Sequence, residues 1–187
     1  ILYGLRGWPR ERDNLDLKPV LTMKSKIVCL KDVPKGAYLG YQRTYRMPTD
    51  GIIGTVPVGY HDGYMRSLSN RGMVLVRGTR VPVVGIVSMD CIMIDLTNLA
   101  RQPGRFLSLE EDVVLIGSQG NERISAEEIG AMAGTIPYEI TCRIGARAHF
   151  VYVDSSEEKD IWEQRPAPPP EKPEVREIAG EAERRTA

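Results

Sequence analysis

Tyrosines in glycine-rich runs are the side chains most able to do chemistry in this sequence. The chain has eight Tyr against two Phe and two Trp, and two of the runs are GYQRTY at 40–45 and GYHDGY at 59–64. A polar run, SMD, follows at 88–90. A phenol can hydrogen-bond a phosphate or carboxylate, and it can act as a base if its pKa falls below its usual value of about 10. A single tyrosine more often packs half-buried, so the runs predict either an anion-binding site with a base or ordinary packing.

The other reactive side chains indicate neither a metal site nor a disulfide framework. His61 could be a general base at neutral pH, whereas His149 stands in a segment expected to be a strand and is expected to be structural. Asp62 precedes Gly63, a pair that is typical of a turn. The chain has three widely spaced cysteines, Cys29, Cys91 and Cys142, and no C-x-x-C motif. This pattern predicts reduced thiols in or near a core, and hence a cytoplasmic protein.

The composition argues against two classes of partner. The 187 residues, 42% of them hydrophobic, suffice for one domain with a core and a tail. Because 25 acidic residues balance 25 basic ones, there is no electrostatic case for nucleic acid or for a membrane surface. No apolar run approaches the roughly 20 residues that cross a bilayer. We therefore expect no nucleic acid and no membrane as partners.

The elements that would position the tyrosine runs are mostly short strands. Residues 21–28 alternate apolar and polar side chains, and 52–58 form a β-branched run in which Pro57 indicates an edge or an irregularity. The glycine-containing run 77–80 predicts a hairpin between two apolar segments. Short strands at intervals of about 8–12 residues predict a mainly β domain, a small barrel or sandwich with one or two short helices. The further strands are expected at 73–76, 81–84, 85–96, 112–116, 135–143 and 148–153.

One helix is predicted with both of its ends. Ser125 and Glu128 form a capping-box pattern in front of the apolar run 129–133. Gly134 directly after that run is typical of a helix C-terminus.

Three regions are expected along the chain: an end of another domain with a charged linker at 1–15, the β domain at 16–153, and a tail at 154–187. The run ILYG at 1–4 resembles the end of a buried strand cut from something larger. The tail contains five prolines, six basic and ten acidic residues, a net charge of 6 − 10 = −4. Such a composition predicts a Pro-rich, charged and mostly disordered tail.

The order of the motifs resembles the C-terminal domain of pyridoxal-phosphate-dependent alanine racemases. No single motif carries the resemblance, which rests on order and spacing over residues 1–153. The matching runs are LKPVLTMKSKIV at 17–28, GY at 40–41, TVPVGYHDGY at 55–64, GIVSMD at 85–90, ISAEE at 124–128 and GTIPYEI at 134–140.

The resemblance implies a racemase with two bases on opposite faces of the amino-acid substrate. Tyr41 would be one base, and a lysine in an N-terminal barrel domain would be the other. The backbone N–H of Met89 would bind the substrate carboxylate. Asp90 would wall the pocket, and Tyr60 would line its entrance. Tyr138 would hydrogen-bond the phosphate of pyridoxal phosphate, and a tyrosine there favours alanine over serine.

The resemblance also implies a head-to-tail homodimer in the cytoplasm, in which this domain acts in trans on the barrel domain of the second subunit. The activity would be interconversion of L-alanine and D-alanine for peptidoglycan synthesis. No lysine here, Lys24 and Lys26 included, stands in a context that matches the cofactor lysine, so the chain alone is expected to be inactive.

Two other functions stay open. A non-catalytic dimerisation or binding module could be derived from this domain. An oligonucleotide-binding barrel is disfavoured by zero net charge and by few Phe and Trp.

Overall fold

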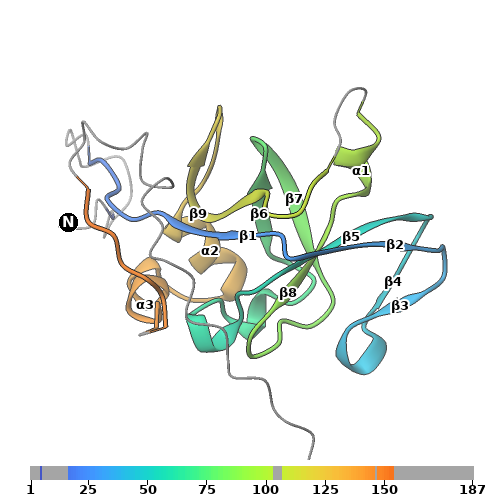
Figure 1. Cartoon of the computed structure of the whole chain (residues 1–187). Helices are drawn as coiled ribbons and strands as arrows, with labels where there is room; N and C mark the ends of the chain where they lie inside the picture. The colour runs from blue at the N-terminus through green and yellow to red at the C-terminus, as the bar shows by residue number, and fades with distance from the viewer. Residues whose placement is uncertain (1–4, 6–16, 103–106, 146, 154–187) are drawn as a thin grey trace, which may run out of the picture. The chain divides into compact units, whose positions relative to one another are not determined.

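The computed structural model describes residues 5, 17–102, 107–145 and 147–153 (Figure 1). The chain divides into two compact units, Ile1–His149 and Phe150–Ala187, and every helix and strand of the described residues belongs to the first. The expected linker and the tail at 154–187 lie outside the described residues. Among the described helices, none has the length and apolar character that a membrane span requires.

Ten short strands, three short α-helices and three single-turn 3-10 helices (Tyr41–Arg43, Tyr60–Asp62 and Arg66–Leu68) make up the first unit in the described part of the chain. The strands are β1 (Met23–Lys26), β2 (Cys29–Val33), β3 (Tyr38–Leu39), β4 (Tyr45–Arg46), β5 (Gly51–Val56), β6 (Met73–Val76), β7 (Thr79–Val84), β8 (Ile92–Asp95), β9 (Asp112–Gln119) and β10 (Glu122–Ile124). The helices are α1 (Thr97–Ala100), α2 (Ala126–Ala133) and α3 (Pro137–Cys142).

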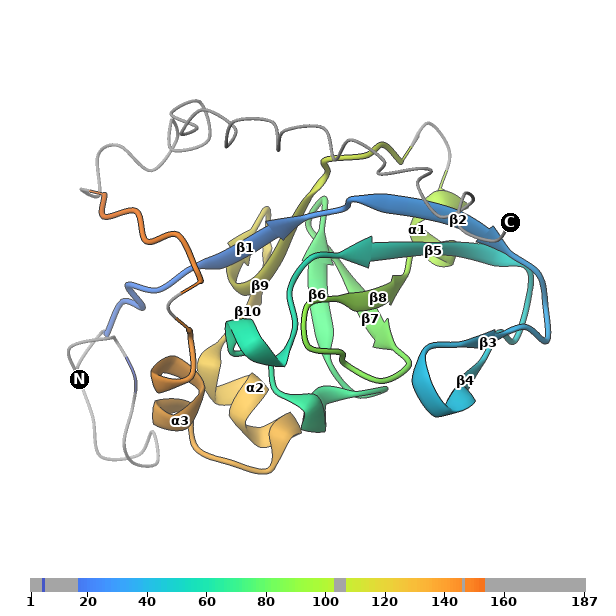
Figure 2. The same cartoon turned by 60° about the horizontal axis from the view of Figure 1, so that its bottom comes forward.

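The main sheet is antiparallel and has the strand order β1-β9-β6-β7-β8-β5-β2, with β10 paired to β9. The strands β3 and β4 form a separate two-stranded hairpin that projects away from this sheet (Figure 2). A mainly β domain with a few short helices is therefore confirmed.

The sheet curls back on itself because its two end strands are successive parts of one extended stretch. Ile27, between β1 and β2, donates its N–H to the carbonyl of Glu111 at 3.0 Å and accepts from the N–H of Glu110 at 2.8 Å. The next residue, Val28, donates instead to the carbonyl of Thr55 in β5 at 2.9 Å. Figure 2 shows β1 and β2 lying in line across the molecule.

Aliphatic side chains from the strands and the two longer helices fill one core. Val74, Ile94 and Leu115 are fully buried, and Ile129 of α2 and Ile140 of α3 join the same cluster. Each such side chain contributes about 1.5–3 kcal/mol by burial. A smaller cluster lies under the β3–β4 hairpin and consists of Leu39, Met47, Ile53 and Val84. The loops described below therefore stand on packed supports.

Several local predictions are confirmed. Ser125 caps α2 by accepting the N–H of Glu128 at 3.2 Å, and Gly134 ends the helix with a φ of 76°. The strands β6 and β7 form the predicted hairpin. Pro57 directly follows the last residue of β5.

Three predicted strands are wrong in whole or in part. Residues 135–143 contain α3, because Pro137 occupies its first turn, where no backbone N–H is needed, and Glu139 complements the helix N-terminus. Of the segment 85–96, only Ile92–Asp95 is a strand, because Gly85 turns the chain with a φ of 76°. Residues 148–153 are not a strand.

Candidate active site

The loop that carries Tyr60 begins just after β5 and closes on its own aspartate. The carboxylate of Asp62 accepts the N–H of Gly59 at 2.9 Å, and Gly63 follows with a φ of 103°. A Cβ on Gly59 would lie 2.4 Å from the carbonyl oxygen of Met89, so only glycine allows this approach. The turn leaves the ring of Tyr60 half-exposed.

This loop is hydrogen-bonded to the loop that carries Met89. Tyr60 donates its N–H to the carbonyl of Ser88 at 3.0 Å, and His61 donates to that of Met89 at 3.1 Å. The hydroxyl of Ser88 accepts the N–H of Cys91 at 3.0 Å and donates to its carbonyl at 2.8 Å, which fixes the second loop. Among the described residues, no group accepts the N–H of Met89, and its side chain is largely exposed.

Arg147 joins the same two loops through one carboxylate on each. Its guanidinium donates to Asp62 over 2.8–3.0 Å and to Asp90 at 2.8 Å. The hydrogen bonds that Arg147 donates to Asp62 and then to Asp90 raise the pKa of Arg147 above its ordinary value. Asp90 is therefore a partner in an ion pair at the edge of the loop.

The helix α3 lies against the loop of Tyr60. A Cβ on Gly63 would meet the carbonyl oxygen of Arg143 at 2.5 Å, and Gly145 donates its N–H to the carbonyl of Asp62 at 3.3 Å. Tyr138 stands on α3 with 39% of its surface exposed. An open hollow between the loop and the helix end is lined by Tyr60, Gly63, Met65, Arg66, Ser67 and Arg143.

Tyr41 stands on a separate loop, between β3 and β4. Gly40, Gln42 and Arg43 adopt positive φ values of 68°, 59° and 53°, and the Tyr41 side chain is 69% exposed. A Cβ on Gly40 would lie 3.5 Å from the backbone nitrogen of Ile86, so the loop rests against the start of the segment that leads to Met89. The recorded hydrogen bonds within the described residues bring Tyr60, Met89 and Asp90 together but do not include the side chains of Tyr41 or Tyr138.

Two other tyrosines are accounted for by packing. Tyr64 is 3% exposed, and burial raises the pKa of its phenol above the usual value. The hydroxyl of Tyr45 donates to Asp95 at 3.4 Å, and burial together with that carboxylate raises its pKa. Both phenols are therefore held protonated at neutral pH.

The site includes residues that sequence reasoning missed. Arg147 is 85 residues from Asp62, so no spacing rule could pair them. Asn70 has a φ of 57° and lies in the run SNRG. That run predicts a turn, but it does not single out Asn70. Arg66 and Arg143 place two cations at the hollow, but neither stands in a recognisable motif.

The described residues fit only part of a pyridoxal phosphate site. The exposed phenol of Tyr138 is a suitable donor to a phosphate. The lysines of the described segments all fall between residues 18 and 35, on none of the loops above, so these residues offer no covalent attachment there. No three His, Cys, Asp or Glu side chains gather as a metal ion would require within the described segments.

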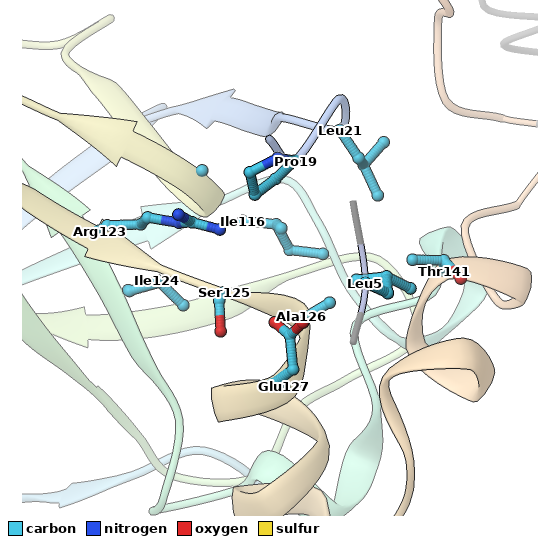
Figure 3. Close-up of a pocket in the computed structure, with 11 residues that line it drawn as sticks. Leu5, Pro19, Leu21, Ile116, Arg123, Ile124, Ser125, Ala126, Glu127 and Thr141 are labelled. Carbon is cyan, nitrogen blue, oxygen red and sulfur yellow. The ribbon is translucent and has the colours of Figure 1, made fainter. Parts of the chain in front are cut away.

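A second hollow lies away from these loops (Figure 3). It contains none of the candidate site residues and is mainly aliphatic. Its lining is Leu5, Pro19, Leu21, Ile116, Gly117, Arg123, Ile124, Ser125, Ala126, Glu127 and Thr141.

Comparisons with known proteins agree on one family. The profile of the alanine racemase C-terminal domain matches residues 20–152. An alanine racemase of Syntrophobacter fumaroxidans is 54% identical over 147 residues, which are 78% of this chain and 37% of that protein. One of Halothermothrix orenii is 49% identical over 152 residues, 81% of this chain and 39% of that protein.

Solved structures give the same result. Alanine racemase from Bacillus anthracis with bound L-Ala-P has a TM-score of 0.71 at 41% identity, covering 79% of this chain and 36% of that one. Alanine racemase from Bartonella henselae with covalently bound pyridoxal phosphate has a TM-score of 0.71 at 30% identity, and the match covers 81% of this chain and 40% of that one. The chain thus spans about two-fifths of the length of these relatives. It belongs to the alanine racemase family and contains that family's C-terminal domain.

Proposed function

We propose that this chain is the C-terminal part of an alanine racemase, in which Tyr41 is one of two bases that interconvert L-alanine and D-alanine. The observation that carries the proposal is the contrast among the tyrosines. Tyr41 presents an exposed phenol on a loop that leans on the segment leading to Met89, whereas Tyr45 and Tyr64 use theirs in packing. The relative from Bacillus anthracis was solved with bound L-Ala-P, which supports an alanine-like substrate.

Each residue of the site has one task in this proposal. Bound pyridoxal phosphate would supply a sink for the electron pair that remains when the α-proton leaves. The phenolate oxygen of Tyr41 takes that proton on one face, or returns one from its hydroxyl, while a base outside this chain serves the other face. The N–H of Met89 binds the carboxylate, Asp90 walls the pocket, Tyr60 lines the entrance and Tyr138 donates to the phosphate.

The same proposal includes a homodimer whose second subunit supplies the barrel domain and its lysine. Large apolar or aromatic side chains at the site are exposed in the described chain, as expected of a surface that another domain covers. They are Tyr41, Tyr60, Met89, Ile136 and Tyr138. A cytoplasmic enzyme that supplies D-alanine for peptidoglycan is the setting we propose.

Tyr41→Phe tests the proposal in a full-length racemase that ends in this domain. The change removes one hydroxyl and keeps the ring, so the exposed loop should fold as before. Exchange of the α-proton with deuterium from water is measured separately for each alanine enantiomer. We expect a loss of roughly 10²–10⁴-fold for one enantiomer and a far smaller loss for the other. Tyr45→Phe and Tyr64→Phe serve as controls and should cost little by comparison. Equal losses in all three variants, or none in Tyr41→Phe, would favour the non-catalytic module.

A further inference from the structure

Asn70 connects the loop of Tyr41 to the segment that leads to Met89. Its side-chain N–H donates to the hydroxyl of Thr44 at 3.1 Å, and its side-chain carbonyl accepts the N–H of Gly85 at 2.6 Å. Its backbone N–H also donates to the carbonyl of Gly85 at 3.2 Å. One side chain thus spans two loops that are far apart in sequence.

The support on which Asn70 stands is itself fixed. Ser69, the preceding residue, donates its hydroxyl to the carbonyl of Arg66 at 2.5 Å and accepts the N–H of Val87 at 3.0 Å. Val87 is fully buried in the main core. Residues 69 and 70 therefore hold the segment 85–87 at both of its ends and tie it to the core.

The loop of Tyr41 has few restraints of its own. Residues 40–44 are all exposed, and β3 and β4 pair over only two residues each. Inside the turn, Arg43 donates its N–H to the carbonyl of Gly40 at 3.4 Å, which is long for such a bond. In the described residues, a second side-chain tie to this hairpin, from Tyr45 to Asp95, is also long at 3.4 Å. A third, from the side chain of Arg46 in β4 to the carbonyl of Gly36, is 3.2 Å long and lies within the hairpin itself. The bond from Asn70 to Thr44 is the shortest of the three.

We propose that Asn70 and Thr44 are positioning residues, which hold the loop so that the phenol of Tyr41 faces the α-carbon of the substrate. This rests on the proposed function of Tyr41. Thr44 ends the turn that begins at Tyr41, so a rotation of the turn about this tie displaces the phenol. Because a misplacement of about 1 Å can reduce a rate by about 10²-fold, loss of the tie should slow proton transfer. The loss falls on the face that Tyr41 serves, because the other base does not stand on this loop.

Thr44→Val tests the positioning role in the full-length enzyme. The substitution keeps the shape, removes the hydroxyl acceptor and leaves the bonds from Asn70 to Gly85 in place. We expect α-proton exchange of the enantiomer served by Tyr41 to fall by at least about tenfold, with less than about twofold change for the other enantiomer. Thr44→Ser keeps the hydroxyl and should stay close to the unchanged enzyme. Asn70→Gly, which tolerates the positive φ, also removes the side-chain bond to Gly85, so it should slow exchange of both enantiomers and slow that of the enantiomer served by Tyr41 more.

A second measurement needs neither cofactor nor activity. Amide hydrogen exchange of residues 40–46 in this chain should be faster in Thr44→Val and unchanged in Thr44→Ser.

Tyr41→Phe in the same exchange assay separates the two ideas. If Tyr41→Phe lacks the one-sided loss, the assignment of the base is wrong. If Tyr41→Phe shows the one-sided loss, two results of Thr44→Val would overturn the positioning role alone. One is an equal loss, or no loss, for the two enantiomers. The other is unchanged amide exchange of residues 40–46.

Discussion

At the scale of single residues, the two tyrosine runs follow a common pattern. The first tyrosine of each run is exposed: 69% of the surface of Tyr41 and 48% of that of Tyr60 are accessible. The second tyrosine of each run turns inward. Tyr64 enters the core, and Tyr45 reaches Asp95 in β8. The sequence identified the runs but could not separate their members, because the partner that occupies the second phenol comes from a strand 50 residues further along.

Met89 should act through its backbone and not through its side chain. The carbonyl of Ser88, in the same peptide unit as the N–H of Met89, accepts the N–H of Tyr60 at 3.0 Å, so the neighbouring loop holds that peptide unit while the side chain of Met89 is exposed. Met89→Leu conserves volume and backbone, so we expect KM for alanine in the full-length enzyme to change by less than about twofold. Steady-state kinetics in both directions check this. A rise in KM of tenfold or more would show that the thioether itself contacts the substrate.

At the scale of elements, the loop of Tyr60 can approach the loop of Met89 closely only because Gly59 has no side chain. Gly59 has extended backbone, so alanine meets no conformational penalty there, but its Cβ would overlap the carbonyl oxygens of Ser88 and Met89 at 2.4 Å. We expect Gly59→Ala to lower the free energy of unfolding by about 1–3 kcal/mol, because backbone atoms must move apart. Thermal or urea unfolding of this chain measures the change.

Gly134→Ala is the matched control for Gly59→Ala. Gly134 has a φ of 76° but no atom within 4 Å of an added Cβ, so only conformational strain applies. That strain is about 1–2 kcal/mol, and the loops of Tyr60 and Met89 should not be displaced. In the full-length enzyme, Gly59→Ala should therefore raise KM while Gly134→Ala should not. Equal effects of the two variants on KM would contradict the role given to the close approach.

Elements were predictable where their signals are local. The α2 cap, its terminal glycine and the β6–β7 hairpin depend on residues within a few positions of each other, and all three are confirmed. The helix α3 was missed because its β-branched residues resemble a strand, although Pro137 in the first turn was an available signal. The ion pairs of Arg147 with Asp62 and Asp90 were not predictable, because these residues are 85 and 57 positions away in sequence and meet only in the folded chain.

The start of β9 should make a pH-dependent contribution to stability. Hydrogen bonds from Arg77 and then Ser108 hold the pKa of Glu111 below its usual range, despite partial burial. A carboxylate with a lowered folded-state pKa stabilises above its unfolded pKa of about 4.3, and this stabilisation is lost as the pH falls through the folded value. Arg77→Gln should therefore reduce the free energy of unfolding by about 0.5–1 kcal/mol at pH 7 and by progressively less as the pH falls below about 4.3.

Unfolding curves of this chain at several pH values test that prediction. Arg77→Lys, which keeps a charge without the forked donor, should fall between the parent and Arg77→Gln. A difference between the parent and Arg77→Gln that is as large at pH 3 as at pH 7 would show that the ion pair is not its cause.

At the scale of the whole molecule, the core formed by the sheet and the helices α2 and α3 has all its described buried members within the first unit. The buried side chains that define it lie between Leu5 and Ile140. The tail at 154–187 is rich in proline and carries a net charge of 6 − 10 = −4. We expect a chain ending at Val153 to melt within about 2 °C of the full chain, since a change of 1 kcal/mol shifts a domain of this size by about 2–4 °C. A drop of more than about 5 °C would show that the tail contributes to the fold.

Without the rest of a racemase, the chain should be unable to complete the reaction. Its described loops and α3 carry the exposed side chains of Tyr41 and Tyr138 and the backbone N–H of Met89, but no lysine. We expect the chain alone to racemise no alanine and to show no lysine adduct after borohydride reduction with pyridoxal phosphate. Addition of the barrel part of a related racemase should restore some activity, because the two bases then stand on opposite faces of one substrate. Tyr41→Phe in the added chain should remove that gain, whereas Tyr64→Phe, once shown to fold, should keep it. Activity of the chain alone, or complementation that ignores Tyr41, would contradict the division of the two bases between the two parts.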